Sequence, residues 1–581
     1  MAMAATTQSV MSGNARSAHG AEAAALDRAV EEVAASAPRF AALGPAERAA
    51  LLRGSLPLLK EQAAGWVAAA CEAKGLPRDH PLEGEDWVTG PFITIRNARL
   101  TAASLDAIAK DGKPPFGTRH RVRPDGRVEV DGFPVDAMDG MLWSGYTGRV
   151  LLQAGVSVEE ARRRQASLYS SGSPKARVCA VLGAGNVSSI PPTDVFHKLF
   201  VEGAVCILKM NPVNEYVGPF LEAALRPLIE PGFLRIVYGG AAEGAQLVNH
   251  PKVDDIHVTG SAETYDRIVW GPPGPEREAR KREGRPVLQK TISAELGNVS
   301  PVIVAPGRYG SKELAFLARG VAAMVSNNAS FNCNAGKLLV LSEGWDQRED
   351  FARAVAAALA EIPPRKAYYP GAFERYERLL SGKLVQRFGE PAEDELAWAY
   401  VRGLDSRDAR EELFQMEPFC AVLSETTLPE TDPVRFLDAA VEFCNGVAWG
   451  TLNAMVCAHP SLEKDAGFVA ALDRAVVDLR YGTVGINVWP ALGYAVACLP
   501  WGGHPSARPE DIQSGLGWVH NTFMLEGVDK SVVRGPLVPM LKPAWHADHR
   551  TVHKLGPKLV DFEASPSWLK VPGLAATAIR G

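Results

Sequence analysis

Apolar residues recur at intervals of three and four along residues 24–109, which is the period of an amphipathic helix. The pair Gly44-Pro45 interrupts this pattern, because neither residue readily continues a helix. We therefore predict a helical N-terminal region made of at least two segments. Residues 1–22, which come before it, are small and polar, and we expect them to be disordered.

Residues 117–133 alternate in polarity on either side of Asp125-Gly126, a dipeptide that favours a tight hairpin turn. The pattern predicts two short antiparallel strands. Polar side chains occupy both faces of the pair, which does not suit strands in a core. We therefore expect this hairpin to be an arm that pairs with another subunit.

Short apolar runs alternate with helical stretches from Arg177 onward. The runs RVCAVLGAG, AVCILKM, FLRIVYGG and DDIHVTGS are separated by segments of helical periodicity. Such β-α-β-α order predicts a parallel, doubly wound sheet. A second alternating region, from Pro301 to about Gly503, predicts a second α/β domain. Between the two lies WGPPGPEREARKREGRP, a charged segment rich in proline and glycine that predicts a surface loop.

Composition narrows the class of protein. The 581 residues are 46% hydrophobic and 22% charged, with a formal net charge of -5. That charge argues against binding nucleic acid through a global electrostatic attraction. The sequence has no run of about eighteen uncharged apolar residues and no apolar segment behind a basic start. We therefore expect neither a membrane span nor a secretory signal.

The eight cysteines form no CxxC pair. This argues against a zinc site or a disulfide framework, so we expect no metal and a reducing, cytoplasmic location. Most of them lie in apolar runs, where a buried structural role is expected. Cys333 is set apart by the residues that accompany it elsewhere in the chain.

Three strands of the first predicted domain end in loops that are polar or contain glycine: LGAGNVSSIPP, LKMNPVNE and VTGSAE. Open parallel sheets bind ligands at the carboxyl ends of strands, where helix N-termini offer N–H groups to phosphate. Further along, Glu295 lies in AELGN, and Cys333 lies in FNCNAG 38 positions later. A thiolate can attack an electrophilic carbon, and a carboxylate can activate the thiol or a water, if the fold brings the two together.

The ordered set of motifs resembles the aldehyde dehydrogenase superfamily over roughly residues 25–520. The motifs are LGAGNVSSIPP, LKMNPVNE, VTGS, AELGNVSP, FNCNAG, EPFCAV, YGTVGIN, PWGG and SGLG. Each motif is degenerate alone, but their order and spacing together are specific. The resemblance implies an α/β fold with two doubly wound Rossmann-like domains, one for the cofactor and one for catalysis, plus a small β arm for oligomerisation.

The implied domain boundaries follow the predicted elements. We expect a cofactor-binding domain over residues 23–294, with the arm at about 117–134, and a catalytic domain over 295–503. Residues 504–581 are expected to form a C-terminal segment that takes part in oligomerisation. Its strand would complete the sheet of a neighbouring subunit, in a homodimer or homotetramer.

Carried over to this chain, the resemblance implies NAD(P)-dependent oxidation of a small-molecule aldehyde to a carboxylic acid. Cys333 would attack the aldehyde carbonyl to form a thiohemiacetal and then a thioester. Asn186, together with the backbone N–H of Cys333, would hold the oxyanion. Glu295 would activate the water that hydrolyses the thioester.

The resemblance also implies a site for NAD or NADP. Lys209 would reach the adenosine ribose, while Gly260 and Ser261 would open the helix that faces the pyrophosphate. Glu417 would hold the nicotinamide ribose, with Phe419 packed beside the ring. A further feature bears on the choice of cofactor: Pro212 stands where NAD-preferring members often carry a glutamate, which removes one barrier to the 2′-phosphate of NADP.

Two other functions remain open. An acyl-CoA reductase would use Cys333 in the reverse direction with NADPH, and the GNV loop resembles such enzymes slightly better. Glu295 favours hydrolysis, because CoA-acylating relatives typically lack a carboxylate at that position. The third function is a catalytically silent binding protein that keeps the fold, which the joint presence of the implied site residues disfavours.

Some residues allow two interpretations. Trp143, Trp489 and Trp501, the last in PWGG, would either line an aromatic substrate tunnel or pack in the core. Lys337 would lower the pKa of Cys333 if its side chain points that way. Asn487 would either line the substrate channel or support the loop that carries the nucleophile.

Overall fold

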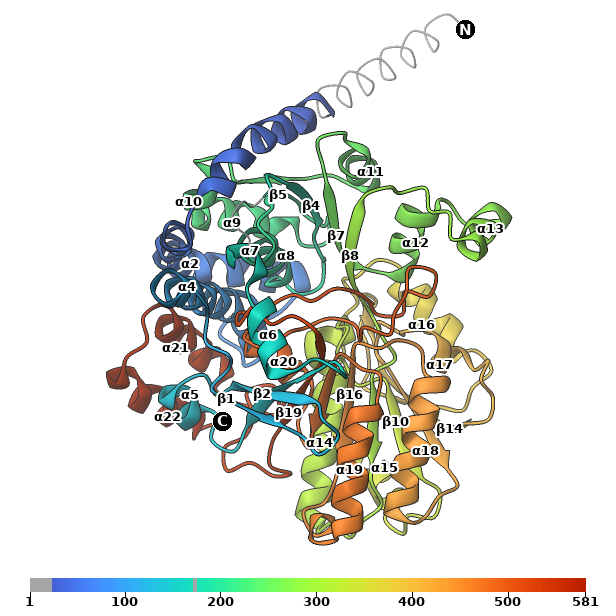
Figure 1. Ribbon diagram of the computed structural model, residues 1–581. Coiled ribbons are helices and arrows are strands. Elements are labelled where there is room, and N and C mark those ends of the chain that lie inside the picture. Colours follow the sequence, from blue (N-terminus) through green and yellow to red (C-terminus); the bar gives the residue numbers. More distant parts are fainter. Residues whose placement is uncertain (1–22, 171–174) are drawn as a thin grey trace, which may run out of the picture.

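Two sheets organise the chain. The structure, a computed structural model, describes residues 23–170 and 175–581 (Figure 1). A six-stranded sheet lies in the upper half of Figure 1 and an eleven-stranded sheet in the lower half. The predicted disorder of residues 1–22 concerns a segment outside the described residues. The α/β class with two largely parallel sheets is as expected.

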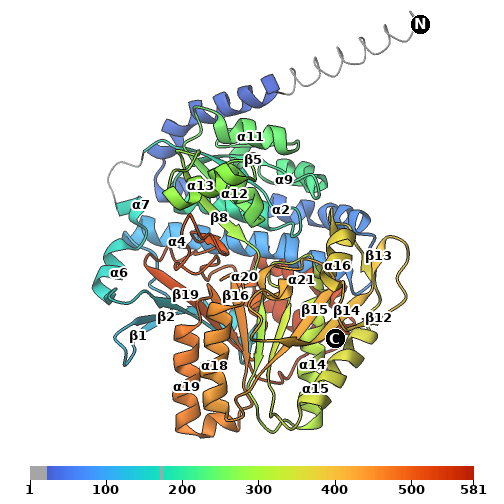
Figure 2. The same cartoon turned by 90° about the vertical axis from the view of Figure 1, so that its right-hand side faces the viewer.

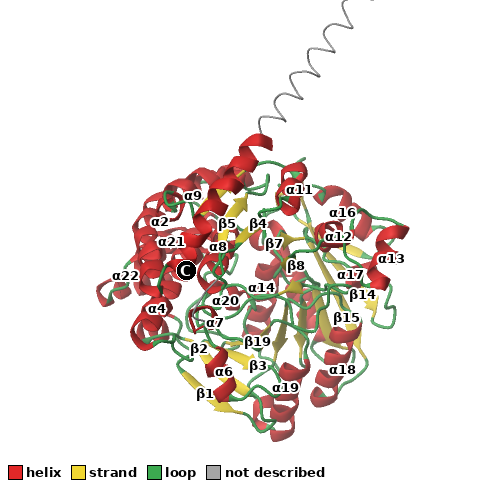
Figure 3. Cartoon of the chain, turned by 45° about the horizontal axis from the view of Figure 1, so that its top comes forward, coloured by secondary structure: helices red, strands yellow, loops and turns green. Residues whose placement is uncertain are grey.

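The N-terminal region is helical, as predicted. A first helix covers residues 23–42, and α2 (Pro45–Lys74) starts on a proline, which suits the first turn because its N–H would be unpaired there. α3 (Glu83–Trp87), a π-helical turn at Val88–Phe92 and α4 (Ile93–Asp111) follow. α2 packs along α4, and Figure 3 shows both on one side of the sheets.

The first sheet has the strand order β18-β8-β7-β4-β5-β6, and its neighbours are parallel except for β18. Its strands are β4 (Val178–Leu182), β5 (Val205–Lys209), β6 (Leu234–Val237), β7 (Asp255–Gly260), β8 (Thr291–Leu296) and β18 (Gly515–Leu516). The chain runs from β4 outward to β6 and then returns to the other side of β4 with β7. Open α/β sheets bind ligands where the strand order reverses in this way.

Helices follow the strands of this sheet as the alternating pattern predicts. They are α8 (Ile190–Phe196) with a π-helical turn (His197–Val201), α9 (Gly218–Ala224), α10 (Arg226–Ile229), α11 (Ala241–Asn249), α12 (Ala262–Trp270) and α13 (Pro275–Glu283). The last of these corrects the prediction of a surface loop. No residue of α13 is buried, so no apolar period marks it, but it starts on proline and places acidic residues in its first turn and basic residues in its last.

The second sheet has the order β1-β2-β3-β19-β17-β16-β9-β10-β15-β14-β12. Its parallel centre is β9 (Pro301–Val304), β10 (Leu338–Ser342), β15 (Val422–Leu428), β16 (Asn453–Cys457) and β17 (Thr483–Ile486), with β14 (Trp398–Asp405) and β12 (Val385–Phe388) at one side. In Figure 2, α14 (Ser311–Ser326) and α15 (Arg348–Ala360) lie on one side of this sheet, and α18 (Pro433–Gly446) and α19 (Ala466–Asp478) on the other.

The predicted hairpin is present as β1 (Arg119–Val122) and β2 (Val128–Phe133), but it pairs within its own chain. β2 pairs with β3 (Thr147–Leu152), β3 with β19 (Val528–Arg534), and β19 with β17. β19 is paired on both sides within the chain, which contradicts the expected pairing of the C-terminal strand with a neighbouring subunit. The hairpin joins the sheet of its own chain because β2 is almost entirely buried, but β1 is exposed and lies at the edge of that sheet. The pairing of the hairpin with another subunit stays a prediction. The homodimer or homotetramer stays a prediction.

The C-terminal segment returns to the N-terminal helices. α21 (Val552–Ala564) packs against α2, α3 and α4, and α22 (Val571–Ala578) packs on α21. A buried ion cluster joins them: Arg96 of α4 lies 2.6 Å from Asp139 and 2.7 Å from Glu563 of α21. Within the described ranges, no helix combines the length and the apolar character that crossing a membrane requires.

Candidate active site

The carboxyl ends of strands in the six-stranded sheet lie next to the amino ends of strands in the eleven-stranded sheet. Glu295 lies at the carboxyl end of β8 in the six-stranded sheet. In the eleven-stranded sheet, Cys333 lies shortly before β10, Glu417 lies before β15, and Asn453 opens β16. The side chain of Asn453 and the hydroxyl of Ser300 both donate to the backbone carbonyl of Cys333, at 3.3 and 3.2 Å. Two side chains at the junction of the sheets therefore fix the position of Cys333 by hydrogen bonds to its backbone carbonyl.

Cys333 and Glu295 are in contact, with 3.8 Å between Sγ and Oε1. The indole N–H of Trp501 donates to the same carboxylate oxygen at 2.8 Å. All eight cysteines lie in the described part of the chain, and Cys333 is the one that retains some solvent exposure, although its thiol group is largely enclosed. The fold thus brings together the thiol and the carboxylate that the sequence singled out.

The acid–base state of this pair is set by its surroundings. Burial and, to a smaller extent, the nearby charge of Asp194 raise the pKa of Glu295 to about 8, although the hydrogen bond from Trp501 acts in the opposite direction. Burial also raises the pKa of the Cys333 thiol well above its ordinary value. Among the described atoms, Oε2 of Glu295 is buried without a hydrogen-bond partner. Glu295 therefore has one oxygen free to accept a proton.

Asp194 belongs to a buried polar chain behind Glu295. Its Oδ2 lies 3.3 Å from Nε2 of His257, and Nδ1 of His257 lies 2.8 Å from the hydroxyl of Ser293. The ammonium group of Lys198 donates to that hydroxyl at 2.8 Å. These contacts fix the position of Asp194, and with it a negative charge close to Glu295.

The loop before Cys333 has a strained backbone. Asn328, Ala329 and Ser330 all have positive φ, at 53°, 54° and 69°. Such conformations cost on the order of 1–3 kcal/mol for each residue that is not glycine, so neighbouring groups must hold them. The side-chain amide of Asn328 donates to the carbonyl of Phe331 at 2.9 Å, closing the loop on itself.

Lys337 supports this loop. Its ammonium group donates to the carbonyl and the hydroxyl of Ser330, at 2.9 and 2.7 Å. Burial lowers the pKa of Lys337 and raises that of Glu417 nearby. Lys337 thus contacts the loop before Cys333, and its ammonium group also interacts electrostatically with the Cys333 thiol. The suggested effect of Lys337 on the pKa of Cys333 stays a prediction.

Asn186 lies against the same loop. Its side-chain amide donates to the carbonyl of Phe331 at 3.1 Å, and its own carbonyl accepts a hydrogen bond from Asn328. An amide nitrogen carries two hydrogens, so one remains for another acceptor. Asn186 and Cys333 line the same cleft.

This cleft has a volume of about 1170 Å³ and runs from the strand-order reversal to Cys333. Lys209 at the end of β5, Gly260 at the end of β7, and Ser261 all line it. The hydroxyl of Ser261 caps α12 by accepting the backbone N–H of Thr264 at 3.2 Å. Burial lowers the pKa of Lys209. The far end of the cleft thus combines a lysine with a helix N-terminus.

Glu417 and Phe419 line the same cleft nearer to Cys333. Oε1 of Glu417 is buried and has no hydrogen-bond partner among the described residues. Glycine is required at Gly297, because a Cβ there would lie 1.7 Å from the other carboxylate oxygen. Phe419 has a φ of 44° and packs edge-on against the ring of Tyr369, with centroids 5.0 Å apart.

A known protein family matches part of this chain. The model of the aldehyde dehydrogenase family matches residues 155–370, which include Asn186, Lys209, Glu295 and Cys333. Over this part of its length, the chain is similar to the aldehyde dehydrogenase family. Aminoaldehyde dehydrogenase 1, peroxisomal, from Malus domestica is 30% identical over 129 residues. That stretch is 22% of this chain and 20% of the apple protein, so the match spans about a fifth of that relative.

Solved structures of the superfamily share the fold over most of the chain. Glyceraldehyde-3-phosphate dehydrogenase from Methanocaldococcus jannaschii, complexed with NADP, has a TM-score of 0.58 and 13% identity. The likeness covers 89% of this chain and 95% of that one. An NAD-dependent aldehyde dehydrogenase from Sinorhizobium meliloti has a TM-score of 0.58 and 18% identity, covering 90% of this chain and 89% of that one. At these identities, the likeness is evidence for the fold alone.

On its other side, Cys333 opens onto an apolar tunnel of about 90 Å³. Trp143, Trp489 and Trp501 all line it, and all three also pack in or against the hydrophobic core. Both interpretations therefore fit, and the passage of a substrate through the tunnel stays a prediction. Trp545, from the C-terminal segment, lines it as well. The resemblance to the superfamily could not reveal Trp545, because it lies beyond the last shared motif.

Asn487 lies away from the nucleophile. With a φ of 55°, it exchanges two hydrogen bonds with the backbone of Ala458, at 2.8 and 2.9 Å. It therefore pins the loop after β16, and lines neither the cleft nor the tunnel. Asp194, Asn328 and Trp501 are the positions whose roles sequence reasoning missed, since their partners are distant in the chain.

Proposed function

We propose that this chain oxidises an aldehyde to a carboxylic acid with NAD(P), through a thioester on Cys333. The observation that carries the proposal is the 3.8 Å contact between Sγ of Cys333 and Oε1 of Glu295. This contact lies where a cleft large enough for a dinucleotide meets an apolar tunnel. Covalent aldehyde oxidation needs a nucleophile that lies beside a base and is accessible from both the cofactor cleft and the substrate tunnel.

In the first half-reaction, Glu295 takes the thiol proton of Cys333, and Sγ bonds to the aldehyde carbon. The raised pKa of Glu295 suits this transfer, because it brings the base closer to the thiol in proton affinity. Negative charge develops on the carbonyl oxygen, where the remaining amide hydrogen of Asn186 supports it. Loss of hydride from the same carbon leaves a thioester.

In the second half-reaction, water attacks the thioester carbon. Glu295 must first release the thiol proton, and its carboxylate then accepts a proton from the water as the C–O bond forms. The C–S bond breaks, the acid leaves, and the thiolate of Cys333 is regenerated. The unpartnered Oε2 of Glu295 supports this role.

The cleft fits NAD(P). Glu417 presents a buried, unpartnered oxygen that suits ribose hydroxyls, and Ser261 begins the helix that suits a pyrophosphate. Bound there, the nicotinamide supplies the hydride acceptor. Lys209 would hold the adenosine ribose or its 2′-phosphate. Pro212, which lines the same cleft, carries no carboxylate to repel that phosphate, so we propose that NADP is accepted.

The proposal is tested with purified protein, an aldehyde panel, and NAD or NADP at equal concentration. We expect NAD(P)H formation without CoA, and its loss in Cys333→Ala. Glu295→Gln should slow both the formation of NAD(P)H in the first turnover and the hydrolysis of the thioester, with steady-state turnover roughly 10²–10⁴-fold lower, because the carboxylate is the base in both half-reactions.

Two results would contradict the proposal in different ways. NADPH consumption that needs an acyl-CoA, with no CoA-free oxidation, would assign the chain to acyl-CoA reduction. Inertness of the wild type with both substrate classes would favour a binding protein. Strict dependence on NAD would contradict the use of NADP.

A further inference from the structure

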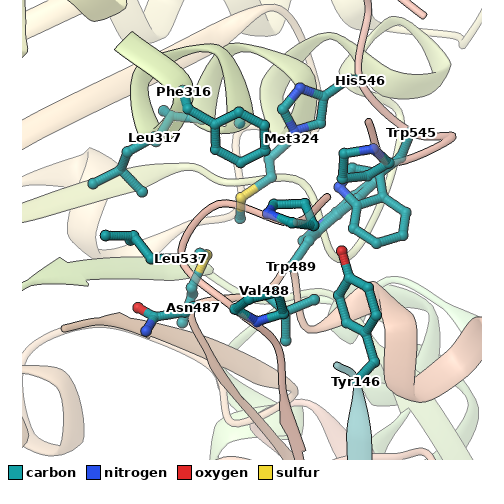
Figure 4. A pocket seen from close by; sticks show the side chains of 16 residues that line it. Tyr146, Phe316, Leu317, Met324, Asn487, Val488, Trp489, Leu537, Trp545 and His546 are labelled. Atoms are coloured by element: carbon teal, nitrogen blue, oxygen red, sulfur yellow. The ribbon is translucent and has the colours of Figure 1, made fainter. Parts of the chain in front are cut away.

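A second cavity lies behind the wall of the catalytic tunnel. It has a volume of about 40 Å³ and shares two wall residues with the tunnel, Trp489 and Trp545. Figure 4 shows these two indoles at one side of the cavity, across from Phe316 and Leu317 of α14. The two tryptophans therefore stand between the space next to Cys333 and a second apolar space.

The two tryptophans are held differently. The indole N–H of Trp489 donates to the carbonyl of Asn334 at 2.6 Å, next to the nucleophile. Trp545 makes no hydrogen bond through its indole within the described ranges, and contacts Tyr146 edge-on with centroids 6.2 Å apart. Trp489 is thus hydrogen-bonded to the segment that carries the nucleophile. Trp545, from the C-terminal segment, is held in the tunnel wall by packing.

The chemistry of the walls excludes an anionic substrate tail. The charged groups among the described residues that line the tunnel are Glu85 and Glu295. The charge of Glu85 is balanced, because Arg365 donates to both of its oxygens, at 3.4 and 3.1 Å. In the second cavity, burial lowers the pKa of His546 to about 4, which leaves it neutral at pH 7. Among the described residues, no cation on these walls is placed to bind a phosphate or a carboxylate.

We propose that the tunnel accepts an uncharged, apolar acyl group, and that Trp545 limits its length by closing the passage into the second cavity. This inference rests on the proposed function and names its substrate class. A chemical group the size of a water molecule needs about 10–15 Å³ of cavity volume. The tunnel therefore has room for roughly six to nine such groups, and the second cavity for roughly three or four. Straight-chain aldehydes of medium length are the expected substrates.

The test measures kcat/KM for straight-chain aldehydes of increasing length. In the wild type we expect a rise of roughly three- to fourfold per added methylene, followed by a fall once the tunnel is full. Trp545→Ala should extend the rise by roughly three or four carbons, because the two cavities merge. Trp545→Phe should give an intermediate limit. Trp568→Ala, an exposed change in the same C-terminal segment, should keep the wild-type profile.

Charge is tested with a matched pair of substrates. Betaine aldehyde and 3,3-dimethylbutanal have the same shape, but only the first carries a positive charge. We expect the neutral aldehyde to react at least tenfold faster in kcat/KM. Preference for betaine aldehyde would overturn the substrate class and indicate a site in which indole rings bind a cation.

Binding without turnover separates this inference from the proposed function. Straight-chain primary amides, which resemble the aldehydes but are not oxidised, are titrated against tryptophan fluorescence. A length limit that moves in Trp545→Ala, with no oxidation of any aldehyde, would sink the proposed function and leave the length limit standing. Oxidation with the same length profile in wild type, Trp545→Ala and Trp545→Phe would refute the role of Trp545.

Discussion

The side chain of Glu295 receives two opposing influences on its pKa. Burial and the charge of Asp194 raise the pKa, to about 8 in total, while the hydrogen bond from Trp501 favours the charged form. Because the base must be deprotonated to act, kcat/KM should rise with pH and reach half its plateau near pH 8. Initial rates between pH 6 and pH 10 measure this.

Two substitutions should move that pH profile in opposite directions. Asp194→Asn removes a negative neighbour, so the pKa of Glu295 falls and the half-plateau shifts to lower pH. Trp501→Phe removes a donor to the carboxylate, so the half-plateau shifts to higher pH. Asp438→Asn, an exposed change on α18, serves as the control and should leave it in place. Shifts of the same sign in both variants would show that another group controls the profile.

Single residues also show where sequence reasoning stopped. Cys333 and Glu295 could be identified from the sequence as candidate catalytic residues, because both lie in motifs that resemble those of the aldehyde dehydrogenase superfamily. Trp501 was a choice between tunnel and core, yet its indole both lines the tunnel and donates to Glu295. That hydrogen bond joins residues 206 positions apart, and local sequence carries no record of so distant a contact.

At the scale of elements, the strained conformation of the loop before Cys333 is stabilised by hydrogen bonds from Lys337. Replacing it by methionine keeps an unbranched side chain but removes the donor to two buried oxygens of Ser330. We expect the free energy of unfolding to fall by about 1–3 kcal/mol. We also expect kcat to fall, because the nucleophile loses its fixed position.

Urea unfolding and steady-state kinetics on the same preparation check this prediction. Lys312→Met, an exposed change on α14, should alter neither quantity. A stable Lys337→Met protein with wild-type kcat would show that the loop holds its conformation without the ammonium group.

The elements themselves were predicted unevenly. The strands β4 to β7 and the hairpin β1–β2 follow from apolar runs and a turn dipeptide, which are local signals. The exposed helix α13 was taken for a loop, since it buries no residue and so has no apolar period. The pairing of β2 with β3 of the same chain was not foreseen, because pairing within or between chains leaves the same alternation in the sequence.

For the molecule as a whole, the buried cluster of Arg96, Asp139 and Glu563 ties the C-terminal helices to the N-terminal ones. Glu563→Gln leaves a buried guanidinium with one carboxylate fewer. We expect a loss of about 3–5 kcal/mol in the free energy of unfolding. Asp561→Asn, on the same helix but in an exposed pair with Lys60, should cost no more than about 1 kcal/mol.

Denaturant titration followed by circular dichroism measures both values. Equal stability of the two variants would mean that the C-terminal segment docks through its apolar contacts alone. Because this segment carries Trp545, the result also tells how firmly one wall of the tunnel is held.

The sequence by itself determined the α/β class, the order of the alternating elements and the pair Cys333 and Glu295. Those properties depend on local periodicity and on the order and spacing of motifs along the chain. The tertiary structure decided the rest: the partner of the arm, the pKa of Glu295, the support of the nucleophile loop and the wall formed by Trp545. Each of these depends on burial or on a contact between distant residues, and both exist only once the chain has folded.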